Sequence, residues 1–335
     1  MSHAIPPSNR AAVDRALFAA FGTTELDAVV PLSGGLSGAL IFRIRVGGIA
    51  YLLRIEGTRD VFRDPARWYA CMEIAAEALL APRVRYADAE DGVAIMEFIQ
   101  ERSLSLEYAG TRTDLLVEMG QTLRALHAAP AFPPLVDYLD GIDALVARFQ
   151  GFGLLAPKES AELFGLQAQL RAAYRTAPQD MVSSHNDLNP RNILYDGARL
   201  WLVDWESSFL ADRYVDLATL ANVFASDAEE EDVLLRTYLG AAPDAAQCAR
   251  LYLMRQVNHL FYAMIFLNGV GEERPSERLD GRQARSLAQI HQALGAGEFA
   301  LESLGGRIEY GLSRFDAALQ GMRAPRFAQA LALVE

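Results

Sequence analysis

The first hundred residues alternate between apolar and polar positions in short runs, a pattern that is typical of β-strands. Apolar residues dominate 40–46 and 50–55, and Gly47-Gly48 between them suits a hairpin turn. The same pattern predicts further strands at 29–30, 83–86 and 93–99, and helices at 11–21 and 65–80. We therefore expect residues 1–98 to form a small sheet-containing lobe.

After residue 98 the apolar spacing changes from two to three and four, as in amphipathic helices. The first such stripe consists of Leu115, Leu116, Met119, Leu123 and Leu126. Further helices are expected at 161–174, 217–224, 229–239, 245–267, 281–294 and 306–322. The exception is 182–203, where two apolar runs flank Asp196-Gly197, a strong hairpin signal. The predicted fold is α+β and bilobal, with a larger and mainly helical lobe at 99–335 and a cleft between the lobes.

Composition narrows the class of protein. The 335 residues are 51% hydrophobic and 22% charged, which is ordinary for a globular protein of two lobes. The net charge is -12 and no dense Lys/Arg run occurs, so we do not expect a nucleic-acid partner. Apolar stretches are shorter than a membrane span, and Cys71 and Cys248 lack a metal-type spacing. We expect a cytoplasmic protein that binds no membrane.

The most informative polar stretch places a histidine, two aspartates and an asparagine around the predicted hairpin. The Asp196-Gly197 turn brings Asn192, before the first strand, beside Asp204, after the second. Their amide and carboxylate oxygens suit Mg²⁺. Asp187 can orient an incoming alcohol and accept its proton, while His185 is expected to brace the loop by hydrogen bonds. The alternative is a hairpin with polar ends, but these offsets favour phosphoryl transfer.

The pattern His185-x-Asp187, then Asn192 and Asp204, resembles the catalytic and metal loops of the aminoglycoside phosphotransferase and choline kinase superfamily. That family has a protein-kinase-like fold. The resemblance implies a kinase that uses ATP and Mg²⁺ to phosphorylate a small-molecule alcohol. It assigns Asp187 as the catalytic base and Asn192 and Asp204 as metal ligands. Asp216 also matches the family pattern, as does Leu126-His127 at the end of a helix.

The resemblance extends to nucleotide binding in the N-terminal lobe. The loop expected over the ATP phosphates contains Ser33, Gly34, Gly35 and Ser37. Arg54 occupies the strand position where most kinases of this fold carry a lysine, and the choline and ethanolamine kinase branch also uses arginine there. Backbone groups of Glu97 and Ile99, where the lobes join, are expected to bind adenine.

The helix glutamate that normally pairs with the Arg54 position is not evident in the sequence. Glu73 and Glu77 are candidates on the 65–80 helix, but the family spacing falls nearer Tyr69. Gly38 also departs from the family, because choline-kinase-like members often carry asparagine at that position.

Trp205 and Glu206 follow Asp204 and resemble the choline kinase side of the family. An aromatic ring and a carboxylate beside the metal suit a cationic amine. Arg255 is also a candidate for the substrate pocket, although it suits a carboxylate or phosphate better. The acceptor therefore stays open among choline or ethanolamine, an aminoglycoside, a sugar and another metabolite, with a nucleotide-binding pseudokinase as a further alternative. The sequence does not indicate an oligomeric state.

Overall fold

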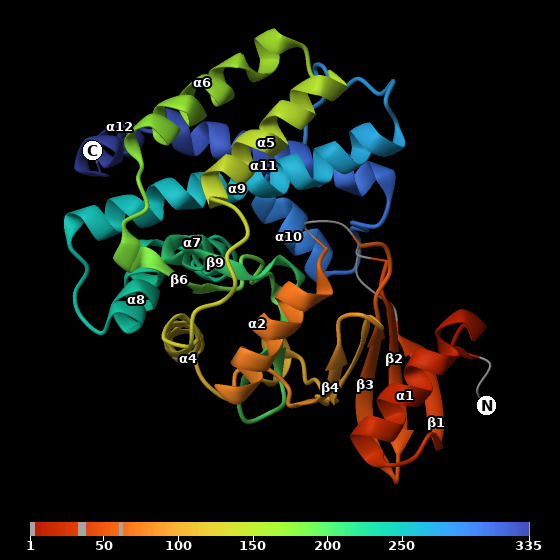
Figure 1. The fold of residues 1–335 in the computed structure, drawn as a ribbon. Coiled ribbons are helices and arrows are strands. Elements are labelled where there is room, and N and C mark those ends of the chain that lie inside the picture. Colours follow the sequence, from red (N-terminus) through yellow and green to blue (C-terminus); the bar gives the residue numbers. More distant parts are fainter. Residues whose placement is uncertain (1–3, 33–37, 60–62, 335) are drawn as a thin grey trace. The chain divides into compact units, whose positions relative to one another are not determined.

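The computed structural model describes residues 4–32, 38–59 and 63–334. They form two compact units (Figure 1). The first unit consists of the chain up to Leu135 together with 181–216 and 223–241, and the second of 136–180, 217–222 and the chain from Ala242 onward. The predicted phosphate loop at 33–37 lies outside the described residues.

The first unit is built on a five-stranded antiparallel sheet with strand order β1-β2-β3-β5-β4. The strands are β1 (Ala28–Leu32), β2 (Leu40–Val46), β3 (Ile49–Ile55), β4 (Val84–Asp88) and β5 (Val93–Glu97). Helix α1 (Arg10–Phe21) packs on β4 and β5, and buries Val13 and Leu17 against Ile44 and Leu53 of the sheet. The predicted strand-rich region is thereby confirmed.

The rest of the first unit carries the hairpin and its supports. Strand β7 (Ile193–Tyr195) pairs with β8 (Leu200–Leu202), and β6 (Met181–Ser184) pairs with β9 (Phe209–Asp212). Helix α2 (Pro65–Glu77) contacts β4, β9 and the short 3-10 turn η5 (Trp205–Ser207). The remaining helices are α3 (Leu104–Glu107), α4 (Arg112–His127) and α8 (Ala228–Leu239), and α4 packs against α8.

The second unit is helical. Its long helix α9 (Ala245–Glu273) packs against α5 (Tyr138–Phe152), α11 (Leu304–Arg323) and α12 (Pro325–Val334), as Figure 1 shows. Helix α6 (Pro157–Ala173) packs on α11 and α12, and α10 (Leu287–Gly295) on α11. Tyr262 and Phe266 of α9 belong to a buried cluster with Ile290 and Tyr310. Helix α7 (Arg213–Phe224) belongs partly to each unit.

The helical prediction for 99–335 is confirmed in kind, but several boundaries differ. Helices α5 and α12 were not predicted, and α10 begins at Leu287 rather than at 281, because Ser286 and Gln289 form a capping box there. Among the described residues, no helix combines the length and the hydropathy needed to cross a membrane. The predicted lobe boundary at 98 and 99 falls inside the first unit and stays a prediction.

Candidate active site

The predicted hairpin is present and its open end holds two of the predicted ligands. Ile193 pairs with Leu202, and the Val203 N–H donates to the Asn192 carbonyl at 3.0 Å. The Asp196 carboxylate closes the turn by accepting from the Ala198 and Arg199 N–H groups at 2.8 and 2.9 Å. Asn192 and Asp204 therefore sit at the same end of the hairpin.

Asn192 is oriented by Asp187. The Asn192 Nδ2 group donates to the Asp187 carbonyl at 2.8 Å and to the Asp187 Oδ2 at 3.2 Å. Because the amide nitrogen faces Asp187, the amide oxygen is the atom left to face a cation. The Asp204 side chain is 40% exposed, and its backbone adopts a left-handed conformation with φ of 67°. This geometry places an amide oxygen, a carboxylate and the candidate base in one small region.

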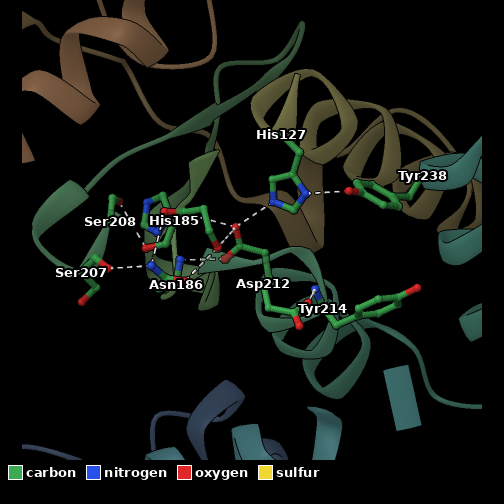
Figure 2. A network of polar contacts seen from close by, with 10 residues as sticks. His127, His185, Asn186, Ser207, Ser208, Asp212, Tyr214 and Tyr238 are labelled. Carbon is green, nitrogen blue, oxygen red and sulfur yellow. Dashed lines mark hydrogen bonds and ion pairs between the residues drawn. The ribbon is translucent and has the colours of Figure 1, made fainter. Parts of the chain in front are cut away.

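The loop that carries His185 is anchored by a buried carboxylate of α7. Asp216 accepts hydrogen bonds from the N–H groups of His185 and Asn186 at 2.8 and 2.7 Å, and from Ser184 Oγ at 2.9 Å. It also contacts His127 Nε2 at 3.1 Å. Figure 2 shows this network, in which His127 lies between Tyr238 and the loop. Asp216 thus fixes the loop backbone immediately before Asp187.

The pKa of Asp216 reflects two opposed causes. Complete burial acts to raise it, but the hydrogen bond and charge of His127, together with His185, more than offset burial. The pKa therefore lies below its ordinary value, and the carboxylate stays charged.

His185 is completely buried and braced from several sides. Its Nε2 lies 3.0 Å from the Val203 carbonyl, and its ring lies 4.7 Å from the Trp205 ring. Trp205 is also buried, with Phe132 on another side at 6.0 Å. The predicted role of Trp205 in the substrate pocket stays a prediction.

Arg54 lies in β3 among three carboxylates. Its Nε donates to Glu56 Oε1 at 2.9 Å, its Nη1 lies 3.4 Å from Asp204 Oδ1, and its Nη2 forms an ion pair with Glu206. The guanidinium also stacks over the Trp68 ring of α2 at 4.9 Å. The contact with Glu56 was not predicted, although residues two apart on a strand share one face.

Glu56 is itself held by α2. The Tyr69 hydroxyl donates to Glu56 Oε1 at 3.4 Å. Burial raises the pKa of Glu56, and the Arg54 charge opposes that change. Burial and the nearby Glu56 charge raise the pKa of Tyr69, so its hydroxyl remains a hydrogen-bond donor.

Arg67 of α2 is a further residue that sequence reasoning missed. Its buried guanidinium donates to the carbonyls of Glu206, at 2.7 Å, and Ser208. Burial lowers the pKa of Arg67. The signal in the sequence was an arginine on the apolar face of an amphipathic helix, where an unpaired charge is costly. Through Arg67, α2 holds the backbone that follows Asp204.

Three other predicted residues belong to other parts of the fold. The Glu97 side chain, at the end of β5, forms an ion pair with Arg85 at 2.7 Å, and Ile99 follows the strand. Arg255 belongs to α9 in the second unit, where its Nε donates to Asn222 Oδ1 at 2.7 Å. Their predicted roles in adenine and substrate binding stay predictions.

The oxygen donors at the open end of the hairpin suit a metal ion that needs few protein ligands. No group of three or more His, Cys, Asp or Glu side chains suited to a metal occurs in the part of the chain that the structure describes. The available donors are one amide oxygen, from Asn192, and the carboxylates of Asp204 and Glu206. Such a sparse oxygen set fits Mg²⁺, which retains waters and phosphate oxygens as its other ligands.

Comparison with known proteins agrees with this geometry. The model of the phosphotransferase enzyme family matches residues 28–252, more than half of the chain. Protein LicA of Haemophilus influenzae is 44% identical over 219 residues, which span 62% of this chain and 62% of LicA, less than two thirds of that protein.

Solved structures show the same fold. A choline/ethanolamine kinase family protein from Mesorhizobium loti has a TM-score of 0.70 and 24% identity, with 98% of both chains covered. The choline kinase LicA from Streptococcus pneumoniae has a TM-score of 0.64 and 18% identity, over 93% of this chain and 98% of that one. A streptomycin-ATP-APH(2'')-IIa ternary complex has a TM-score of 0.59 and 13% identity, over 78% and 90% of the two chains.

Proposed function

The chain belongs to the phosphotransferase enzyme family, and on that premise we propose that it transfers the γ-phosphate of ATP to a hydroxyl group of a small molecule. The observation that carries the proposal is the open end of the hairpin. There Asn192 is oriented by Asp187 and lies at the same end of the β-ladder as Asp204. In-line phosphoryl transfer requires a candidate base together with metal-binding oxygens, and Asp187, Asn192 and Asp204 supply these groups.

Each residue has a distinct role in this proposal. Asp187 orients the acceptor hydroxyl toward the γ-phosphorus and takes its proton as the new P–O bond forms and the bond to ADP breaks. Asn192 and Asp204 would hold Mg²⁺, which would supply positive charge to neutralise the phosphate oxygens. Arg54 binds the α- and β-phosphates, and His185 braces the loop that carries Asp187.

The proposed acceptor is an amino alcohol similar to choline or ethanolamine. Support comes from the choline and ethanolamine kinases among the solved relatives. Glu206 also supports it, because its carboxylate lies close to Asp204 in the chain and suits a cationic amine. Arg255 favours a different acceptor, an alcohol that also carries a carboxylate or phosphate. The aminoglycoside complex among the structural relatives keeps that class in consideration as well.

The proposal predicts that the purified protein releases ADP from ATP and Mg²⁺ when supplied with one member of an acceptor panel. The panel contains choline, ethanolamine, sugars, hydroxy amino acids and aminoglycosides, and ADP is followed by a coupled assay. Asp187→Asn should lower kcat by about 10²–10⁴-fold, because it removes the proton acceptor and keeps the shape.

The matched control is Asp232→Asn, which alters an exposed carboxylate of α8 that pairs with Arg236. This variant should keep the turnover of the wild-type protein. ADP release that is the same with and without every acceptor, or an Asp187→Asn variant with full turnover, would contradict the proposed function.

A further inference from the structure

The α2 helix presents no carboxylate to Arg54. In kinases of this fold, a glutamate on the corresponding helix fixes the phosphate-binding cation. Here the α2 side chains nearest to the guanidinium are Trp68, over which it stacks, and Tyr69, which reaches it through Glu56. Glu73 and Glu77 of α2 are exposed to solvent.

The three carboxylates around Arg54 differ in their exposure and in whether a bound metal would compete for them. Asp204 and Glu206 follow β8, and their side chains are 40% and 22% exposed. A Mg²⁺ ion bound at Asp204 would compete with Arg54 for that segment. The Glu56 side chain is 9% exposed, and Glu56 directly follows the strand that carries Arg54. Glu56 is therefore the acid that stays with Arg54 when a metal and a nucleotide are bound.

The backbone around this pair is hydrogen-bonded to the neighbouring strands and turn. Strand β3 is paired on both sides, so that Arg54 lies opposite Ile41 of β2 and Ala94 of β5. The Glu56 N–H donates to the Gly92 carbonyl at 2.8 Å. Both partners are thus fixed by the sheet, whereas a helix glutamate would depend on the position of the helix.

We infer that Glu56, held by the Tyr69 hydroxyl, is the positioning residue that fixes Arg54 for the nucleotide phosphates, in place of a glutamate on α2. This assignment rests on the proposed function, since it concerns how the same site grips ATP. Glu56 acts through Arg54 and touches no substrate. Its effect should therefore depend on the presence of Arg54.

A double-mutant cycle on nucleotide binding tests this dependence without any acceptor. Binding of ADP with Mg²⁺ is measured by calorimetry for the wild type, Arg54→Ala, Glu56→Gln and the double variant. Arg54→Ala should weaken binding about tenfold or more in the wild-type background, because a charge-assisted hydrogen bond is lost. In the Glu56→Gln background the same change should weaken binding less than threefold.

Adenosine serves as the matched ligand, since it lacks the phosphates that Arg54 would bind. Its affinity should be the same in all four proteins, which a general loss of structure would not allow. Glu73→Gln alters an exposed carboxylate of α2, the helix that carries Tyr69. This variant should leave ADP binding and the effect of Arg54→Ala unchanged.

Equal effects of Arg54→Ala in the two backgrounds would overturn the assignment of Glu56. So would a wild-type protein that binds no ADP with Mg²⁺. A wild-type protein that binds ADP but phosphorylates no acceptor would overturn the proposed function instead, and the cycle would still decide the role of Glu56. Where turnover is measurable, Glu56→Gln should lower kcat more than it raises the KM for the acceptor.

Discussion

Asp216 shows how one buried side chain can determine the geometry of a loop. Its two oxygens accept hydrogen bonds from the backbone N–H groups of His185 and Asn186. They also accept from the side chains of Ser184 and His127. Asn186 has a φ of 63°, a left-handed conformation that its hydrogen bonds maintain. An amide at position 216 would offer one acceptor oxygen instead of two.

We therefore expect Asp216→Asn to lower the free energy of unfolding by about 3 kcal/mol near neutral pH. The pKa of Asp216 in the folded protein lies below the ordinary 3.8. Its contribution is thus fully present above pH 3.8 and is lost as the pH falls through the folded value. Urea unfolding of wild type and variant at several pH values should show the difference between them shrinking below pH 3.8. A difference that does not vary with pH would contradict this account.

A site residue could be predicted from the sequence when its partners lie near it along the chain. Asn192 and Asp204 could be placed together because a strong turn signal lies between them. Glu56 could have been found from the two-residue period of a strand. Asp216 matched a family pattern, but its four donors come from α4, from the end of β6 and from the loop that follows it. That convergence is set by tertiary packing.

At the scale of elements, the β7–β8 hairpin depends on Gly197. Its φ is 98°, and a Cβ placed there would lie 2.9 Å from Arg102 Nε. The backbone conformation is costly for any L-amino acid, and the exposed Arg102 side chain would have to move aside for a larger residue.

Gly197→Ala should therefore lower the free energy of unfolding by about 1–3 kcal/mol and reduce turnover, since the hairpin positions Asn192 and Asp204. Chemical unfolding and ADP release measure the two effects. Gly165→Ala in α6 is the control, because nothing lies within 4 Å of an added Cβ there. The control should be neutral or stabilising by up to about 1 kcal/mol. Equal stability changes in both variants would contradict the role of the turn.

Helix boundaries were harder to predict than helix existence. The apolar residues of α5, Leu139, Ile142, Val146 and Phe149, recur at three and four, and Asp137 caps the helix, so its signal was present in the sequence. In α9 the apolar pattern continued past 267, and neither Gly269 nor Gly271 ended the helix. Packing of α9 against three other helices outweighs the low helix propensity of glycine.

At the scale of the whole molecule, the two units contain different acid-sensitive groups. In the second unit, His259 is partly buried and its Nδ1 lies 2.9 Å from Arg314 Nη1. Burial, together with the charges of Arg314, Arg255 and His291, holds the pKa of His259 well below its ordinary value of 6.5. His259 is therefore neutral in the folded protein and accepts a hydrogen bond from Arg314.

His259 binds a proton more readily in the unfolded chain than in the folded protein. Its contribution to stability is therefore fully present above pH 6.5 and is lost as the pH falls below that value. Between pH 7 and pH 5 the wild type should lose about 2 kcal/mol more stability than His259→Gln, whose amide oxygen can accept the same hydrogen bond. Urea unfolding monitored by circular dichroism measures both proteins. Parallel pH profiles for the two would contradict the assignment.

The three tryptophans of the chain, Trp68, Trp201 and Trp205, all belong to the first unit, whereas the aromatic residues of the second unit are tyrosines and phenylalanines. Trp68 stacks on Arg54, and Trp205 packs on His185. Intrinsic tryptophan emission is consequently a selective optical signal for the first unit, which contains the proposed nucleotide site. It separates unfolding of the first unit from the far-ultraviolet signal to which every helix contributes, and it offers a label-free titration of nucleotide and metal.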